Sequence, residues 1–441
     1  MVNSQTNQGA LTRGFVLGKL GLKLAGSYLG YQAQNLFLGE GERTQRQARF
    51  QQQASRRLRE ELGQLKGPVM KLGQLVSMGS GALHPEALEE LANLQMRAPG
   101  MHASLARAQF KSALGKYPEE LFREFDPEPF AAASLGQVHR GITQSGEKVA
   151  IKIQYPAIRS AIENDFKFFR SLTLPGRVTG HFPAALLGEF ERGTLEETDY
   201  LHEAQNLEFF RKELKGLTYL SIPRVYHELS GDRVLTMSFI EGAPLRNWLM
   251  EKPSAAVRNL VGERLVEMYH TQLHWLKALH ADQHPGNYLF QSDGRIGLVD
   301  FGCVKRLRLE MTEIMDSMIN RSWRASDAAS RRFLGLVEGE NMPLHRARKL
   351  LPVAEASADF LYPQGPLANP VVNFCDPKLL ELATRNSKQV LRNRLLNPEY
   401  LFVSRAELGF VHLLHELGAK VNMAAVWHRV STAPAVGHHH A

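Results

Sequence analysis

The sequence predicts an α+β protein of two lobes with an all-helical N-terminal extension. Helical patterns fill roughly the first 120 residues, whereas residues 130–153 alternate and end in the β-branched strand VAIKIQ. Helical patterns dominate again from residue 244. The chain has 441 residues, of which 44% are hydrophobic and 22% charged, which is ordinary for a globular protein with a large core. The order is therefore a helical extension, a sheet-rich lobe and a helical lobe.

We divide the chain where these patterns change. The predicted segments are a basic amphipathic segment at 1–42, a helical extension at 43–125, a first lobe with inserted helices at 126–242, a helical second lobe at 243–430 and a disordered tail at 431–441. Within the first lobe we expect helices near 157–172 and 184–215, and strands at 222–229 and 233–240. A short hairpin is predicted around Asp293-Gly294.

The positive charge of the chain is concentrated at its N-terminus. The formal net charge is +8, and residues 1–66 carry ten Lys and Arg against four Glu, a surplus of six. Anionic lipid headgroups and nucleic acid both attract such a segment. The basic residues lack interleaved aromatic side chains, which disfavours nucleic acid as the partner. An anionic membrane surface is the partner that we expect.

Residues 11–38 are apolar and rich in glycine, but they do not fit a membrane-spanning helix. Lys19 and Lys23 lie one helical turn apart, and no run of eighteen apolar residues escapes charge. Two interpretations stay open. The segment forms an amphipathic helix on a membrane surface, or it packs its apolar face on the protein itself.

Two further features bear on localisation. The two cysteines, Cys303 and Cys375, cannot build a disulfide framework and are typical of a reducing compartment. Residues 1–10 are polar and do not resemble a cleaved signal peptide. We therefore expect a cytoplasmic protein that is peripheral on the inner face of the membrane.

The stretch 279–302, LHADQHPGNYLFQSDGRIGLVDFG, carries the clearest chemistry. It contains H-x-D-x-x-x-x-N with Asp282 and Asn287, then the predicted hairpin, then Asp300-Phe301-Gly302. Phosphoryl transfer needs metal ions that neutralise charge on the phosphate oxygens, and amide and carboxylate oxygens are ligands that Mg²⁺ accepts. The pattern predicts Asn287 and Asp300 as Mg²⁺ ligands and Asp282 as the residue that orients the nucleophile.

The same stretch permits a second interpretation. His280, Asp282 and His284 alternate along an extended loop and could converge on a zinc ion. A further His or Cys ligand is not evident nearby, so this alternative is the weaker one.

Lys152 stands at the centre of the strand VAIKIQ, upstream of the Asp/Asn/Asp set in the order that kinase folds use. In that order the lysine holds the α- and β-phosphates and pairs with a helical glutamate. Glu197, Asp199 and Glu203 offer the acidic partner, and Glu203 shares a helical face with Asp199 or Glu196 by spacing.

The loop before this strand departs from the glycine-rich pattern of protein kinases. It reads FAAASLGQVHRG at 130–141, and alanines cannot take the positive φ angles that glycines allow. We expect a stiffer loop, in which Ser134 and Gly136 donate to phosphate oxygens.

Taken together, these motifs resemble the UbiB family, also called ABC/ADCK or AarF proteins, which are atypical protein-kinase-like ATPases linked to ubiquinone metabolism. The matching pieces span roughly residues 60 to 305. They are Lys71-Leu72-Gly73-Gln74 as K-x-G-Q, Ala131, Ala132, Ala133 and Ser134 as the alanine-rich loop, Lys152 in VAIKIQYP, Glu197-Thr198-Asp199 as E-x-D, HADQHPGN and LVDFG. The family usually has proline where this chain has Gln283, a departure from which we expect little consequence.

The resemblance implies roles for further residues. Lys71 would pair with the E-x-D motif at Glu197, Lys152 with Glu203, and Gln74 would reach towards the nucleotide. The alanine-rich loop would cover ATP or ADP. Residues 237–241 would form an adenine-binding hinge through their backbone, with Met237, Phe239 and Glu241 as its members.

The activity implied by the resemblance is Mg²⁺-dependent ATP hydrolysis coupled to a prenyl-lipid or quinone precursor, with ubiquinone-biosynthesis enzymes as partners. After Cys303-Val304-Lys305 the sequence passes almost at once into a helical pattern, and it holds no A-P-E anchor. Phosphorylation of other proteins is therefore not expected. Two alternatives remain: a small-molecule kinase with the same fold, and a non-catalytic scaffold that is gated by nucleotide.

Overall fold

A computed structural model describes residues 101–133, 135–173, 184–338, 371–381 and 398–432, together with isolated positions between 345 and 383. The predictions for the segment 1–42, for Lys71 and Gln74, for Ser134 and for the end of the tail lie outside the described residues. The chain divides into two units, which we describe separately: Met1–Leu201 with Tyr226–Met237, and His202–Val225 with Ser238–Ala441.

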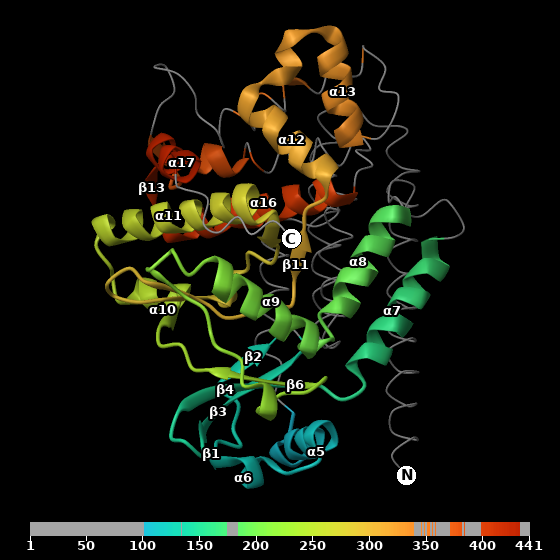
Figure 1. The fold of residues 1–441 in the computed structure, drawn as a ribbon, viewed down its shortest axis with the longest axis vertical. Coiled ribbons are helices and arrows are strands. Elements are labelled where there is room, and N and C mark those ends of the chain that lie inside the picture. Colours follow the sequence, from blue (N-terminus) through green and yellow to red (C-terminus); the bar gives the residue numbers. More distant parts are fainter. Residues whose placement is uncertain are drawn as a thin grey trace, which may run out of the picture. The chain divides into compact units, whose positions relative to one another are not determined.

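The first unit is built on an antiparallel sheet in the order β1-β3-β4-β6, with β2 also paired to β3 (Figure 1). Its strands are β1 (Phe122–Phe125), β2 (Ala131–Ala133), β3 (Gly136–Thr143), β4 (Lys148–Gln154) and β6 (Val234–Ser238). The sheet thus begins at Phe122, four residues before the predicted start of the first lobe. Contacts group residues 202–225 with the second unit, whereas the sequence placed them in the first lobe.

Helix α5 (Ala103–Leu114) covers this sheet with an apolar face. Phe110 is fully buried together with Phe122, Ile151 and Val234 in one core cluster. The helix ends at Gly115, which takes the left-handed conformation and donates to the Lys111 carbonyl. The short helix α6 (Pro118–Leu121) then leads into β1.

Two longer helices, α7 (Ile158–Thr173) and α8 (Ala184–Glu196), lie side by side in the first unit (Figure 1). The single helix predicted over 184–215 is wrong, because residues 197–199 form a turn before α9 (Tyr200–Glu213) begins. Asp199 Oδ1 accepts from the Leu201 backbone at 3.1 Å, as an N-terminal cap of α9 does. Glu203 therefore does not continue the helical face that carries Glu196.

The strand predicted at 222–229 is also wrong. Pro223 cannot donate to a ladder, and the run ends in a short 3₁₀ helix, η1 (His227–Leu229). The strand predicted at 233–240 is confirmed in β6. The turn before β6 is closed by the Ser230 side chain, which accepts from the Thr236 backbone at 2.9 Å.

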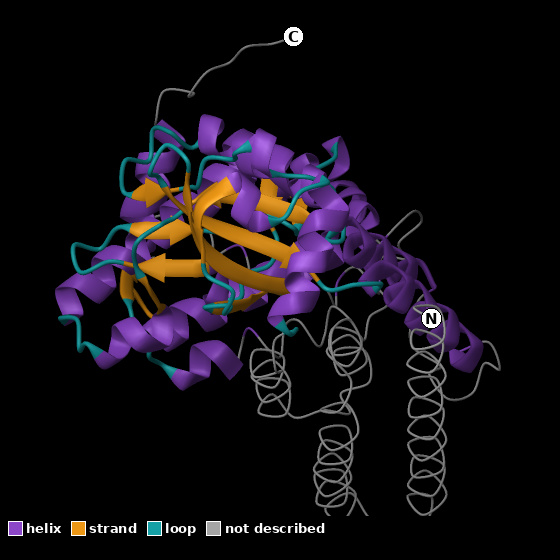
Figure 2. Cartoon of the chain, turned by 90° about the horizontal axis from the view of Figure 1, so that it is seen from below, coloured by secondary structure: helices purple, strands orange, loops and turns teal. Residues whose placement is uncertain are grey.

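In its described part the second unit is mainly helical, with three small sheets. Its helices are α9 after its first two residues, α10 (Leu245–Met250), α11 (Ala255–His270), α12 (Leu309–Asn320), α13 (Asp327–Glu338), α16 (Pro398–Leu417) and α17 (Met423–Thr432). A π-helix, Thr271–Leu276, follows α11, and 3₁₀ turns occupy Pro285–Asn287 and Ser322–Ala325. The presence of both helices and strands (Figure 2) confirms the predicted fold class.

The small sheets place the functional motifs. Strands β5 (Leu220–Ser221), β10 (Ile296–Leu298), β9 (Tyr288–Phe290) and β7 (Ala243–Pro244) form one sheet in that order. The predicted hairpin is confirmed, since β9 and β10 pair antiparallel around Asp293-Gly294. Strand β8 (Ala278–His280) pairs with β11 (Val304–Arg306), and β12 (Val371–Asn373) with β13 (Lys420–Asn422).

Among the described residues, none of the helices has the length and apolar character needed to cross a membrane.

Gly136 provides a test of the packing in the first unit. A Cβ built at this position would lie 2.3 Å from the Ile153 carbonyl oxygen and 2.9 Å from the Tyr200 hydroxyl. We expect Gly136→Ala to lower the free energy of unfolding by about 1–3 kcal/mol, because backbone atoms have to move apart. Chemical denaturation monitored by circular dichroism measures this loss.

Gly188 is the matched control, because it lies in α8 and an added Cβ there meets nothing within 4 Å. Gly188→Ala should raise the free energy of unfolding by about 0.5–1 kcal/mol through helix propensity. Equal effects of the two substitutions would contradict the packing described for β3 and β4.

Candidate active site

The loop between β8 and β9 carries Asp282 and Asn287. The side-chain amide of Asn287 donates to the Asp282 carbonyl at 2.9 Å, which closes the loop on itself. The backbone of Asn287 accepts from Val299 at 3.1 Å, next to the end of β10. Both side chains are half-buried. The two residues singled out from the sequence are thus held in one short loop of the second unit.

Asp300 follows β10 in the same unit. Its Oδ1 accepts from the Gly302 backbone at 3.0 Å, and its carbonyl lies 2.5 Å from His280 Nε2. Because the Asn287 nitrogen is used in the bond to Asp282, the Asn287 side-chain oxygen is the atom that could ligate a metal. The side-chain oxygen atoms of Asn287 and Asp300 are of the hard kind that Mg²⁺ prefers.

Phe301 is held by α9 at both of its backbone polar groups. Glu203 Oε1 accepts from the Phe301 nitrogen, and Asn206 Nδ2 donates to the Phe301 carbonyl, each at 3.3 Å. Glu203 and Asn206 stand three residues apart and therefore share one face of the helix. The ring of Phe301 is fully buried, with its centroid 5.2 Å from that of Phe210. Asn206 was not singled out from the sequence, although its spacing from Glu203 is a usable signal.

The segment after Gly302 runs back along β8, the strand that leads into the loop with Asp282. In the β8–β11 pair, Val304 stands opposite His280. The buried carboxylate of Glu399, from α16, accepts from the backbone nitrogen and from Nε of Arg308, each at 3.0 Å. Helix α12 begins at the next residue, Leu309. The short path from Asp300 to a helix, expected from the sequence, is confirmed.

His280 is supported by a residue that the sequence did not reveal. Gln272, in the π-helix, accepts with its Oε1 from the His280 backbone nitrogen at 2.8 Å. The wider turn of a π-helix is frequent at functional sites, and here it ends at Lys277 in the left-handed conformation just before β8. Sequence patterns with a period of 3.6 residues cannot reveal such a local change of winding.

The zinc alternative is wrong. The imidazole of His280 is fully buried and bonded to the Asp300 carbonyl, while His284 Nδ1 accepts from the Gly286 backbone at 3.0 Å. Across the part of the chain that the structure describes, no three His, Cys, Asp or Glu side chains are placed to hold a metal ion together.

Gln283 has a larger role than the sequence suggested. Its side chain is buried and donates through Nε2 to the His280 carbonyl. Its Oε1 accepts from the hydroxyl of Tyr288. Burial, and to a lesser degree the charge of Asp282, raise the pKa of Tyr288, so the hydroxyl remains a neutral donor. A proline at position 283 could make neither of these side-chain bonds.

In the first unit, Lys152 lies mid-strand in β4, opposite Val138 of β3, and is 95% buried, with a relative exposure of 5%. Its Nζ stands over the Tyr200 ring, 5.0 Å from the centroid, a geometry in which the ring stabilises the cation. The pairing of Lys152 with Glu203 stays a prediction.

The three alanines of the alanine-rich loop are paired with the strand that follows them. Ala131 to Ala133 form β2, which pairs antiparallel with Gly136 to Val138 of β3. These alanines are exposed or half-buried. The missing Cβ of Gly136 is what allows β3 to approach Ile153 so closely.

Glutamine side chains bond to the backbone of the E-x-D residues and of the predicted hinge. Glu197 is buried, and the carbonyl of Thr198 between the two acids accepts from Gln154 of β4 at 2.9 Å. Met237 is buried in β6, and the carbonyl of Glu241 accepts from Gln291 at 2.8 Å. The adenine contacts of Met237, Phe239 and Glu241 stay a prediction, as does the pairing of Glu197.

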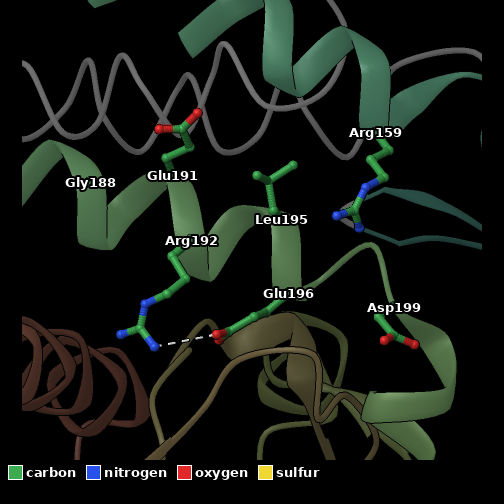
Figure 3. A pocket seen from close by; sticks show the side chains of 7 residues that line it. All are labelled: Arg159, Gly188, Glu191, Arg192, Leu195, Glu196 and Asp199. Carbon is green, nitrogen blue, oxygen red and sulfur yellow. Dashed lines mark ion pairs between the residues drawn. The ribbon is translucent and has the colours of Figure 1, made fainter.

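A cavity of about 430 Å³ lies beside the E-x-D turn in the first unit (Figure 3). Opposite charges meet on its wall, where Arg192 and Glu196 stand 3.5 Å apart. Arg159 donates to the Thr198 hydroxyl at 3.1 Å, which connects α7 to the turn. The cavity is lined by Arg159, Gly188, Glu191, Arg192, Leu195, Glu196 and Asp199.

Comparison with known proteins identifies relatives of this arrangement. Residues 93–329 match the family described as the ABC1 atypical kinase-like domain. The chain is 32% identical to the probable protein kinase UbiB of Tolumonas auensis, over 58% of this chain and 50% of that protein. It is also 32% identical to the chloroplastic protein ACTIVITY OF BC1 COMPLEX KINASE 7 of Arabidopsis thaliana, over 57% of this chain and 37% of that protein. The matched part thus spans half or less of the length of these relatives.

A solved structure supports the fold. The Rv3197–erythromycin complex from Mycobacterium tuberculosis is similar with a TM-score of 0.57 and 25% identity, over 90% of this chain and 99% of that chain. The similarity extends over most of the sequence and agrees with the predicted atypical kinase-like fold.

The half-buried Glu407 of α16 should make the stability of the protein depend on pH. Burial raises the pKa of its carboxyl from 4.5 to about 7. The folded protein therefore holds this proton more tightly than the unfolded chain, so the stability that the group contributes is present below pH 4.5 and is lost as the pH rises through about 7. We expect Glu407→Gln to stabilise the protein relative to the parent at pH 8 and to gain little at pH 5. Thermal unfolding at both pH values measures this, and an identical difference at the two would contradict it.

Proposed function

The chain belongs to the ABC1 atypical kinase-like family, which includes UbiB proteins, and from that premise we propose that it binds ATP with Mg²⁺ and hydrolyses ATP. The observation that carries the proposal is the arrangement of Asp282, Asn287 and Asp300 in one unit, closed by the bond from Asn287 to the Asp282 carbonyl. Kinase-type phosphoryl transfer uses this set of side chains.

Each residue has a chemical task in the proposal. Asn287 and Asp300 would hold Mg²⁺, which when bound neutralises charge on the phosphate oxygens. Asp282 orients the attacking water, and Lys152 holds the phosphates. Lys152 is suited to this because it is buried in a strand of the sheet. Its ammonium group is therefore already positioned and does not need to reorganise during the reaction.

The segment after Asp300 argues against a protein kinase that acts on other proteins. Residues 304–306 are paired to β8, and Arg308 is bound to the buried Glu399. Protein kinases seat their peptide substrate on a long segment at this point, and here only residues 302–308 separate Phe301 from the start of α12 at Leu309. ATP hydrolysis or the phosphorylation of a small molecule fits such a short segment better.

The physiological partners are proposed from the family resemblance. We propose that ATP turnover is coupled to a prenyl-lipid or quinone precursor in ubiquinone biosynthesis. The basic segment 1–42 would bring the protein to an anionic membrane from the cytoplasmic side, next to enzymes of that pathway.

Removal of the proposed metal carboxylate tests the activity. We expect Asp300→Asn to lower kcat for ATP hydrolysis by about 100-fold or more, because one ligand charge of Mg²⁺ is lost. Release of phosphate from ATP in the presence of Mg²⁺ measures the rate. Asp316→Asn, the same chemical change on the exposed surface of α12, should leave the rate at the parent value.

The outcomes separate the alternatives. An Asp300→Asn variant that turns over ATP as fast as the parent would exclude the assignment. Tight nucleotide binding by the parent with negligible turnover would indicate the nucleotide-gated scaffold. Transfer of labelled phosphate to a metabolite from a cell extract would indicate a small-molecule kinase.

Coupling to a membrane is tested by lipid vesicles. We expect anionic vesicles that contain a prenyl-lipid to raise ATP turnover by the full chain. A variant without residues 1–40 should lose this stimulation and should no longer float with the vesicles, since it lacks the apolar, glycine-rich stretch 11–38 that carries Lys19 and Lys23. Uncharged vesicles are the control, and stimulation that persists in the shortened chain would contradict a role of the N-terminal segment.

A further inference from the structure

The loop that carries Asp282 has an unusual internal support. Gln283 is buried, whereas its neighbours Asp282 and His284 are half-buried. The Gln283 amide bonds to both strands that flank the loop. Its Nε2 donates to the carbonyl of His280 in β8, and its Oε1 accepts from the hydroxyl of Tyr288 in β9. One side chain thus connects both ends of the loop.

The Tyr288 hydroxyl depends on this bond. Tyr288 is fully buried, and in the part of the chain that is described Gln283 Oε1 is the acceptor of its hydroxyl. A buried hydroxyl without a partner is costly. The two side chains therefore need each other.

The pair is linked to the backbone of Asp282 through Asn287. Asn287, at the other end of the loop, donates to the Asp282 carbonyl at 2.9 Å and directly precedes Tyr288. Any shift of Tyr288 would therefore move Asn287, and with it the backbone of Asp282.

Helix α16 supports the pair from behind. A Cβ built on Gly409 would lie 3.3 Å from Gln283 Cβ, so the helix backbone approaches this side chain closely. The next residue of α16, Phe410, stacks on Tyr269 of α11 with 4.5 Å between the ring centroids. The packing of Phe410 holds α16 close to Gln283. The space around Gln283 is therefore limited, which favours the side-chain conformation that reaches both partners.

We propose that Gln283 and Tyr288 are a pair of positioning residues that hold Asp282 and Asn287 in their working geometry. The proposal rests on the proposed function, in which Asp282 orients the nucleophile. Rigid support of the groups around a reacting centre is what sets such geometry. In this chain hydrogen bonds replace the stiffness that a proline at position 283 would give to the loop.

A double-mutant cycle in the full chain tests the proposal. Gln283→Leu and Tyr288→Phe should each lower kcat for ATP hydrolysis by about tenfold, because each leaves a buried polar group without its partner. The double variant should lose about tenfold as well, rather than the about 100-fold that independent effects would give. KM for ATP should stay within about twofold of the parent in all three, because neither residue is proposed to touch the nucleotide.

Tyr219→Phe is the matched control. The Tyr219 hydroxyl also donates to one side chain in the same unit, Glu267, at 3.1 Å. That bond lies outside the catalytic loop, so its loss should lower stability without changing kcat. A fall in kcat for this control equal to that for Tyr288→Phe would show that general destabilisation explains the effect and would overturn the proposal.

Hydrogen exchange gives a readout that does not need activity. Backbone amides of residues 281–288 should exchange at least about tenfold faster in Gln283→Leu and in Tyr288→Phe than in the parent, and should be unchanged in Tyr219→Phe. Faster exchange with no ATP turnover by the parent would refute the proposed function while supporting the pair as the support of this loop. Unchanged exchange, or independent effects in the cycle, would overturn the pair itself.

Discussion

His280 is the residue on which the candidate site of the second unit depends. Its backbone nitrogen donates to Gln272, its carbonyl accepts from Gln283, and its Nε2 lies 2.5 Å from the carbonyl of Asp300. It also ends β8, where it stands opposite Val304 of β11. One buried residue thereby fixes the strand before the catalytic loop and the residue that is proposed to bind the metal. Because unpaired polar groups are costly in the interior, each of these bonds constrains the others.

The Asp300-Phe301-Gly302 turn is held in one position by its neighbours. The backbone of Phe301 is bonded on both sides to α9, through Glu203 and Asn206, and its ring is fully buried. The strand that follows is paired to β8, and Glu399 then binds Arg308. Moving Phe301 out of its site would break these contacts together. A turn held in this way suits a constant metal-binding geometry better than a switch, and switching is what a long activation segment provides in protein kinases.

Local sequence patterns predicted the parts of this structure whose contacts are close in the chain. The hairpin around Gly294, the strand that carries Lys152 and the loop from Asp282 to Asn287 all follow from turn residues and motif spacing within short windows. The patterns failed where a distant contact decides the backbone. Residues 197–199 break a helix that periodicity would continue, since the Thr198 carbonyl is bonded to Gln154 of β4, 44 positions earlier. The site likewise contained residues that spacing could not show, such as Gln272 from a π-helix.

Position 283 shows why a departure from a family pattern is hard to judge from sequence. Glutamine in place of proline exchanges a covalent restriction of the backbone for two hydrogen bonds of a side chain. Whether that exchange preserves the loop depends on the residue at 288, which must offer a donor, and on Gly409, which lets α16 approach. Both positions lie outside the motif H-x-D-x-x-x-x-N, so the consensus of the motif does not include them. The support of Asp282 is therefore a property of three positions together, and a substitution at one of them changes the loop only as far as the other two allow.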